Sequence, residues 1–254
     1  LASRMPEAVF ATLLTALEAT SGSERAGLRA ALTDALARGG STTLKTASDW
    51  VAAASDKPIR VRAAAALAFA SAPGAGIVTT RLLASSVQDA EAFPDRWRLI
   101  EAAGRVAPEP QAVATDSTSA VAAHAETQSE ADADVRAVDA WLEHIAVTVS
   151  PAWMLRAAAV SALAARAAER AEAVARAALS DEVPRVRIAA LEVLARAPDA
   201  IEVLGRSIRE DKWFSVRIAA LEALPQAPEA QALVTDSLED RSAVARAAAI
   251  RVLR

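Results

Sequence analysis

Hydrophobic residues recur along this chain with the period of an α-helix, most regularly between residues 181 and 194. In that stretch Val186, Ala189, Ala190, Val193 and Leu194 fall at positions i, i+3, i+4, i+7 and i+8, which share one face of a helix. Further apolar residues widen this face, so that polar residues are confined to a narrow stripe. A helix of this kind must be covered on two sides, and stacked helical repeats provide that cover.

The same pattern returns twice more before the end of the chain, and each copy starts with an aspartate. The three copies run from Asp181 to Leu194, from Asp211 to Leu224 and from Asp240 to Leu253. Their period of roughly thirty residues is typical of a solenoid array. A turn containing proline and a second amphipathic segment follow the first copy, so the predicted unit is helix, turn, helix and short loop.

Weaker copies extend the array toward the N-terminus. Segments similar to the regular copies begin at Asp56 and at Ser150, where serine replaces the aspartate, and a degenerate copy spans 93–103. The remaining predicted helices cover 5–20, 24–38, 43–54, 75–88, 136–149, 169–179 and 200–209. Gly39-Gly40 ends the second of these. In total we expect about seven helix pairs and one terminal helix.

Residues 109–134 interrupt the array and are predicted to form an irregular acidic insertion. The segment carries no basic residue, and its acidic residues are Glu109, Asp116, Glu126, Glu130, Asp132 and Asp134. We interpret it either as a mobile loop that recruits a basic partner or as a solvated insertion without a role. The last helix ends at Arg254 without a C-cap glycine or a partner helix, so we expect the chain to be one region of a longer protein.

The composition of the chain favours an all-helical fold. Hydrophobic residues make up 53% of its 254 residues, and alanine, the best helix former, dominates. Cysteine is absent, which excludes disulfides and thiolate sites. No apolar run reaches the ~18 residues that a membrane span needs. The net charge of −4 argues against general binding to polyanions such as nucleic acids.

The loop aspartate, the Val-Arg pair, the Ala-Ala pair and the later leucine resemble the HEAT family of repeats, specifically the short bacterial variety related to phycobilisome-lyase-type repeats. The resemblance is strong from about residue 153 to the end, fair over 56–107 and weak elsewhere. It implies an all-α, right-handed superhelical solenoid of helix pairs (an α-α superhelix, armadillo-like) that forms one domain over 1–254. It also implies a ladder in which loop aspartates and helix arginines tie neighbouring repeats together: Asp56, Arg62, Asp181, Arg187, Asp211, Arg217, Asp240 and Arg246.

The sequence offers little chemistry for catalysis or metal binding. His124 and His144 are the only histidines, and neither belongs to a cluster with the spacing of metal ligands, so no metal site is predicted. Glycine-rich phosphate loops, dinucleotide fingerprints and the Gly-x-Ser-x-Gly nucleophile turn are also absent from the sequence. We therefore predict a protein that is not an enzyme and that uses no cofactor.

A column of arginines, one in each clear repeat, allows two interpretations. Its members are Arg62, Arg98, Arg156, Arg187, Arg217 and Arg246. The column could line a concave face and bind phosphates, as HEAT-like repeats of a DNA glycosylase family bind DNA, or it could form an internal ladder of Asp–Arg pairs. Four of the six arginines follow an aspartate by six residues and the chain is acidic overall, so we favour the internal ladder.

Tryptophans stand out in a chain that is poor in aromatic residues. Trp153 and Trp213 lie at loop-to-helix junctions, and Phe214 follows Trp213 directly. Aromatic side chains exposed along one ridge would anchor a peptide or protein partner. The alternative is that the tryptophans fill gaps between alanine-rich helices.

The function that these patterns predict is a non-enzymatic scaffold for protein–protein interaction, with Trp153, Trp213 and Phe214 as candidate contacts. The partner would be a protein or peptide whose identity the sequence leaves open, as it leaves open the oligomeric state. Two alternatives remain: a nucleic-acid-binding or repair module with a concave arginine face, and an accessory protein of the lyase type, suggested by repeat similarity alone. We expect a cytoplasmic location, although a chain trimmed of its leader would also begin as this one does at Leu1.

Overall fold

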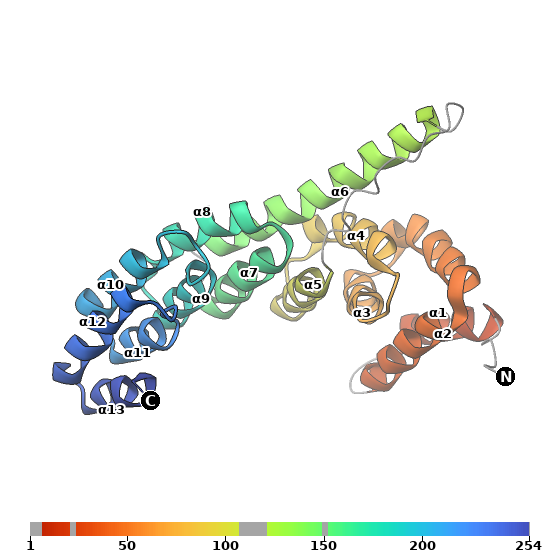
Figure 1. Cartoon of the computed structure of the whole chain (residues 1–254). Coiled ribbons are helices and arrows are strands. Elements are labelled where there is room, and N and C mark those ends of the chain that lie inside the picture. Colours follow the sequence, from red (N-terminus) through yellow and green to blue (C-terminus); the bar gives the residue numbers. More distant parts are fainter. Residues whose placement is uncertain (1–6, 21–23, 107–120, 149–151, 254) are drawn as a thin grey trace. The chain divides into compact units, whose positions relative to one another are not determined.

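The computed structural model describes residues 7–20, 24–106, 121–148 and 152–253, which form an all-α structure (Figure 1). These residues contain thirteen α-helices, three short 3₁₀ helices and no strand, which confirms the predicted fold class. Contacts between residues divide the chain into two compact units, Leu1–Leu142 and Glu143–Arg254. The arrangement of 1–254 as one continuous repeat domain therefore stays a prediction.

Helix α3 lies at the centre of the N-terminal unit. The helices of this unit are α1 (Glu7–Ala19), α2 (Glu24–Ala52), α3 (Ile59–Ala70), α4 (Gly76–Ala84), α5 (Phe93–Arg105) and the first part of α6 (Val121–Val147). Every residue of α3 from Val61 to Phe69 is buried, because α2, α4 and α5 pack against it. Its run of alanines makes this possible, since methyl side chains let neighbouring helices approach closely.

Helix α2 replaces the two separate helices that the sequence predicts over 24–38 and 43–54. The two halves join at Gly40, whose φ of 62° and ψ of −146° are not helical. A residue with a side chain rarely adopts a positive φ of this kind, whereas glycine does so readily. The predicted break at Gly39-Gly40 is thus present as a kink within α2.

Three aromatic rings pack together where α1, α2 and α3 meet. The ring centroid of Phe69 lies 6.2 Å from that of Phe10 and 6.2 Å from that of Trp50, which approaches it edge-on. Trp50 also donates its indole N–H to Glu18 at 3.0 Å. Trp50 therefore fills a gap between helices, as the structural interpretation of the tryptophans expects.

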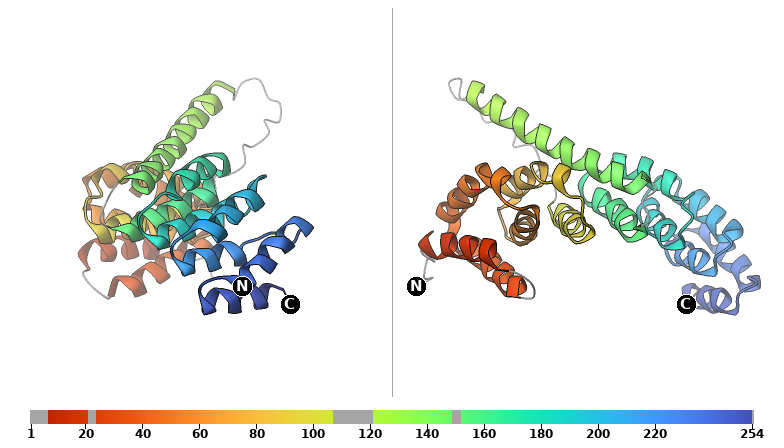
Figure 2. Two further views of the ribbon diagram at one scale, coloured as in Figure 1. Left: turned by 90° about the vertical axis from the view of Figure 1, so that its left-hand side faces the viewer. Right: turned by 180° about the vertical axis from the view of Figure 1, so that it is seen from behind.

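The C-terminal unit is built from two layers of helices. Its helices after α6 are α7 (Trp153–Arg166), α8 (Ala168–Ala178), α9 (Pro184–Leu194), α10 (Ala200–Glu210), α11 (Phe214–Glu222), α12 (Pro228–Asp236) and α13 (Ala243–Val252). Helices α7, α9, α11 and α13 pack side by side in one layer, and α8, α10 and α12 cover them as the second layer (Figure 2). The alternation of layers along the chain is that of stacked helix pairs.

The core of this unit lies between the two layers. Leu191 and Leu204 are fully buried, and Val216 and Leu221 are almost completely buried with them. The second alanine of each Ala-Ala pair, for example Ala190, has no exposed surface. The repeat has a physical reason, because apolar residues that recur in each copy are buried. Each copy therefore contributes the same positions to the core.

Part of the predicted irregular insertion is helical. Residues 121–134 form the first half of α6, while residues 109–120 lie outside the described residues. The helical part contains neither glycine nor proline and is rich in alanine and glutamate, so it needs no repeat pattern to form a helix. Arg81 of α4 lies 3.7 Å from the carboxylates of both Glu130 and Asp134, which attaches α6 to the unit.

Candidate partner-binding surface

A ladder of buried Arg–Asp pairs connects successive repeats of the C-terminal unit. The pairs are Arg156 with Asp181, Arg187 with Asp211, and Arg217 with Asp240. In each pair two guanidinium nitrogens donate to the two carboxylate oxygens at 2.7 to 3.0 Å. The aspartate always belongs to the loop before the next helix of the same layer. Each arginine therefore connects its own helix to the following repeat.

These arginines also hold the loop that precedes their own helix. The Nη1 atom of Arg187 donates to the backbone carbonyl of Asp181 at 2.7 Å, and Arg217 donates in the same way to Asp211 at 2.9 Å. Hydrogen bonds from Arg217 hold the pKa of Asp240 below its ordinary value despite burial. The ladder is therefore a chain of charge-assisted bonds that runs through the unit.

The loop aspartates also fix the start of each following helix. The carboxylate of Asp211 accepts the backbone N–H of Trp213 at 2.8 Å, and Asp181 and Asp240 accept the N–H groups of Val183 and Ser242. Burial raises the pKa of Asp181, yet its bonds from Arg156 and from the N–H of Val183 hold it below the ordinary value. The loop-to-helix junctions are therefore held by both backbone and side-chain bonds.

In the N-terminal unit the ladder uses a different aspartate from the one that the sequence suggests. Arg62 donates to Asp89 at 2.5 Å and to the carbonyls of Ser85 and Lys57, whereas Asp56 is exposed. Asp89 does not fit the spacing of the regular copies, because it precedes Arg98 by nine residues instead of six. A search that allowed a longer loop would have found it.

The concave arginine face that would bind nucleic acid has little support in this geometry. Arg62, Arg156, Arg187 and Arg217 are only 3% to 7% exposed, and each binds a carboxylate. The two other members of the column differ from these four. Arg98 pairs with Asp95 of its own helix at 3.0 Å, and Arg246 is exposed and donates to the carbonyl of Asp240 at 2.8 Å.

Trp213 and Phe214 form an exposed aromatic pair at the start of α11. They are 47% and 44% exposed, while the third predicted contact, Trp153, is only partly exposed at the start of α7. Of the other tryptophans, Trp141 is buried and Trp97 is 39% exposed and stacks on a phenylalanine. Exposure thus distinguishes Trp213 from the tryptophans that fill gaps.

Two further apolar side chains, which the sequence did not single out, are exposed at other helix starts of the same layer. Met154 at the start of α7 is 41% exposed, and Val244 at the start of α13 is 54% exposed. They hold equivalent places, each two residues before the arginine of its repeat. Because α7, α9, α11 and α13 pack side by side, their first turns follow one edge of the layer. We call Met154, Trp213, Phe214 and Val244 the apolar ridge.

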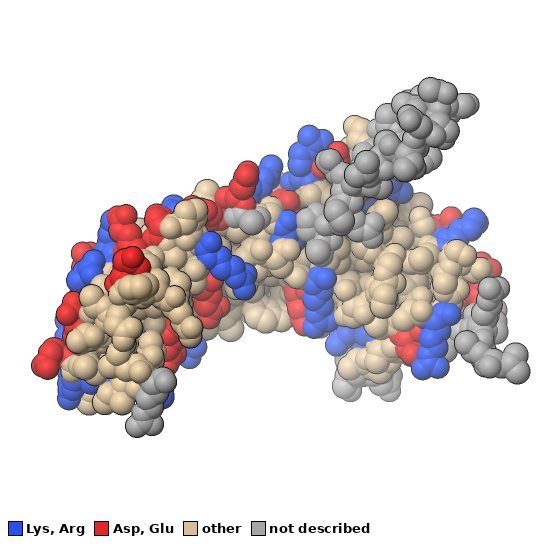
Figure 3. Space-filling view, viewed as in Figure 1, with Lys and Arg blue, Asp and Glu red and all other residues tan. Residues whose placement is uncertain are grey.

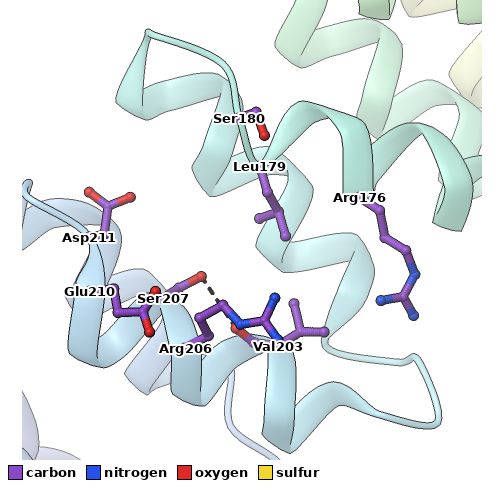
Figure 4. Close-up of a pocket in the computed structure, with 8 residues that line it drawn as sticks. All are labelled: Arg176, Leu179, Ser180, Val203, Arg206, Ser207, Glu210 and Asp211. Atoms are coloured by element: carbon purple, nitrogen blue, oxygen red, sulfur yellow. Dashed lines mark hydrogen bonds between the residues drawn. The ribbon is translucent and has the colours of Figure 1, made fainter.

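A surface cavity of about 470 Å³ lies on the opposite layer, between α8 and α10 (Figure 4). Arg176 lines it, and bonds to Asp199 and Glu172 raise the pKa of this arginine. On the other side Arg206 pairs with Glu202 of its own helix. Because these charges already bind one another, the cavity offers less to a ligand than the ridge does.

Both histidines belong to helix α6. His144 is exposed in α6, and His124 lies in the same helix with its side chain outside the described residues. The part of the chain that the structure describes contains no group of three or more His, Cys, Asp or Glu residues arranged to hold a metal ion. Among the same residues, no helix is long and apolar enough to cross a membrane.

Comparison with protein families gives a match over part of the chain. Residues 138–225 match the family model for HEAT repeats, a stretch that begins in α6 and ends after α11. The predicted resemblance is confirmed over this stretch, and HEAT repeats imply an α-α solenoid. A comparison with curated proteins finds no match to the chain.

Proposed function

We propose that this chain, whose residues 138–225 match the family model for HEAT repeats, is a non-catalytic scaffold that binds an apolar segment of a protein partner along the apolar ridge. HEAT-repeat domains generally serve protein interaction and are typically not catalytic. The observation that carries the proposal is the exposure of two adjacent aromatic side chains, Trp213 and Phe214, at one helix start. Aromatic side chains of this kind are the usual anchors of protein interfaces.

The ridge is suited to binding because its backbone is already ordered. Asp211 accepts the N–H of Trp213 while it binds Arg187, and the guanidinium of Arg241 donates to the carbonyls of Asp211 and Lys212 at 3.1 and 3.2 Å. A partner that docks on a fixed backbone avoids the entropy cost of ordering it. The free energy of each aromatic contact therefore contributes more fully to affinity.

The charges beside the aromatic pair indicate what the partner segment carries. Lys212 directly precedes Trp213 in the sequence and is exposed, and the exposed Arg241 donates to the carbonyl of Lys212. A segment with apolar side chains for the ridge and acidic residues beside them would complement this surface. The proposed partner is therefore an amphipathic, acidic segment.

The proposal is tested by comparing captured partners between the intact chain and two variants. The double variant Trp213→Ala/Phe214→Ala removes the anchor, and Trp97→Ala removes an equally large exposed tryptophan from the other unit. If each anchor contributes about 2 kcal/mol, losing even one weakens binding by about 30-fold. We expect a protein that the intact chain and the Trp97→Ala variant recover equally and the double variant loses. Equal recovery by all three would show that the ridge is not the binding surface.

A further inference from the structure

The apolar ridge is interrupted at α9, where an arginine takes the place of an apolar residue. Met154 and Val244 are the second residues of α7 and α13, and the second residue of α9 is Arg185. All three side chains are exposed. Helix α9 packs against α7 on one side and against α11 on the other. Arg185 therefore lies between Met154 and the exposed aromatic pair of α11.

The Arg–Asp ladder keeps these helices in the same register. Arg156, Arg187 and Arg217 are each the fourth residue of their helix. Each binds an aspartate that lies three residues before the next helix of the layer begins, at 2.7 to 3.0 Å. Because the same bond recurs at the same two positions, equivalent residues of α7, α9, α11 and α13 follow one another across the layer. The second residues of these helices therefore form one row.

Arg185 differs from the ladder arginines because no described residue balances its charge. Within the described part of the chain it forms no ion pair and its guanidinium donates no hydrogen bond. Glu182, the nearest acidic residue along the chain, does not pair with it. A positive charge in the first turn is also unfavourable for the helix, because the positive end of the macrodipole lies there. The charge of Arg185 is therefore available to a partner.

We infer that Arg185 makes the apolar ridge specific for a partner segment that has an acidic residue between two apolar ones. This role rests on the proposed function and deepens it, because it gives the order of the side chains in the partner. The two apolar side chains contact Met154 and the aromatic pair, and the carboxylate between them pairs with Arg185. A guanidinium group can bind a carboxylate through two parallel hydrogen bonds. Apolar contacts on both sides exclude water from such a pair.

The spacing of the helices sets the spacing of these side chains in the partner. Packed helices lie about 8–10 Å apart, and an extended chain rises about 3.3 Å per residue. An extended segment therefore places roughly every third residue over the start of the next helix. The expected pattern is an apolar, an acidic and a second apolar residue at intervals of about three residues.

A general attraction between opposite charges cannot provide this selectivity. Basic and acidic side chains are interspersed on the visible face of the C-terminal unit (Figure 3). Interactions between exposed charges are largely screened beyond about 8 Å at physiological ionic strength. Discrimination therefore depends on the one charge that lies within the row, and a basic residue opposite Arg185 is rejected by like-charge repulsion.

The experiment is a selection of random peptides displayed on phage, with the full chain as the target. Peptides that the Trp213→Ala/Phe214→Ala variant no longer binds are the ridge-dependent ones, and the strongest of them is labelled and titrated by fluorescence anisotropy. Arg185→Gln should weaken its binding about tenfold, equivalent to about 1.4 kcal/mol. Arg196→Gln is the matched control, because Arg196 is also exposed but lies beyond the other end of α9, and it should bind as the original chain does.

Reversal of the charge separates pairing from a merely structural role. Arg185→Glu should bind the peptide more weakly than Arg185→Gln does, because it adds repulsion to the lost attraction. Exchange of the acidic residue of the peptide for lysine should then restore binding to Arg185→Glu. A residue that matters only for folding would show no such rescue. Circular dichroism melting of the variants checks that they are folded, as the exposure of Arg185 leads us to expect.

The outcomes distinguish this inference from the proposed function. If no selected peptide depends on Trp213 and Phe214, the proposed function fails and the role of Arg185 fails with it. If ridge-dependent peptides carry no acidic residue between apolar ones, or bind Arg185→Gln as tightly as the original chain, only the role of Arg185 is overturned. Ridge-dependent peptides that carry the acidic residue, lose affinity with Arg185→Gln and are rescued by the charge exchange support both.

Discussion

The buried Arg187–Asp211 pair offers the most direct test of what holds the C-terminal repeats together. The two side chains are only 8% and 13% exposed, and they share bonds of 2.8 and 2.9 Å. Arg187→Met removes the guanidinium and keeps an unbranched apolar chain in its place. Asp211→Asn removes the negative charge and keeps the size of the side chain. The double variant Arg187→Met/Asp211→Asn removes both charges together.

The expected magnitudes follow from burial. Removing one partner of a buried ion pair costs about 3–5 kcal/mol, because the other charge is left buried and unpaired. Asp211 keeps its bond from the N–H of Trp213 and some contact with water, so Arg187→Met should cost about 3 kcal/mol, the lower end of that range. The double variant leaves no buried charge. Its free energy of unfolding should therefore fall by much less than the sum of the decreases in the two single variants. A coupling free energy of about 2 kcal/mol between the two positions is expected.

The assay is urea unfolding of the four proteins at pH 7, followed by far-ultraviolet circular dichroism. Tryptophan fluorescence is recorded in parallel, because repeat arrays can unfold in stages and a single free energy then loses its meaning. Arg206→Ala is the control, since Arg206 and its partner Glu202 are 65% and 72% exposed and such a pair contributes about 0–1 kcal/mol. If Arg187→Met costs no more than the control, or if the single effects add up in the double variant, the ladder does not stabilise the repeats as a buried pair.

Three other changes test separate parts of the structure. Gly40→Ala should cost about 1–3 kcal/mol because of the positive φ, whereas Gly27→Ala in the same helix should be neutral or stabilising by up to about 1 kcal/mol; thermal melting measures both. The lowered pKa of Asp240 stabilises the fold above the unfolded pKa of about 3.9, and this contribution is lost as the pH falls through the folded pKa. Urea midpoints between pH 7 and 3 should therefore fall more steeply for the original chain than for Asp240→Asn. Leu191→Ala should lower the free energy of unfolding by about 2–5 kcal/mol in the same urea assay. Glu192→Ala, at the exposed neighbouring position, should lower it by less than about 0.5 kcal/mol. Similar losses in the two variants would contradict the proposed core.

The local sequence was sufficient to predict the helices whose hydrophobic residues recur with the helical period. The regular copies predicted the positions of α9, α11 and α13, and Pro184 opens α9 as expected of proline in a first helical turn. The glycine pair predicted a break between two helices, which the structure shows as the kink of α2, because the backbone there needs a conformation that glycine adopts readily. These features depend on neighbouring residues, which a sequence displays directly.

The sequence could not show the features that depend on residues far apart in the chain. The loop between Asp89 and α5 is longer than in the regular copies, so pattern matching did not connect Asp89 with Arg62. The exposure of Trp213 depends on what the neighbouring repeats leave uncovered, whereas Trp141 has the same chemistry and is buried.

Stability and the proposed recognition surface meet at a single carboxylate in the C-terminal unit. Asp211 binds Arg187 of the preceding repeat with both oxygens and, through one of them, also accepts the N–H of Trp213. The same carboxylate thus joins two repeats and fixes the backbone at the start of the exposed aromatic pair. Since hydrogen bonds to an ionised group are stronger than neutral ones, the charge that stabilises the interface also stiffens the ridge. A repeat array can therefore vary its exposed residues while the aspartate and arginine keep their positions, because the ridge and the ladder use different atoms of the same loop.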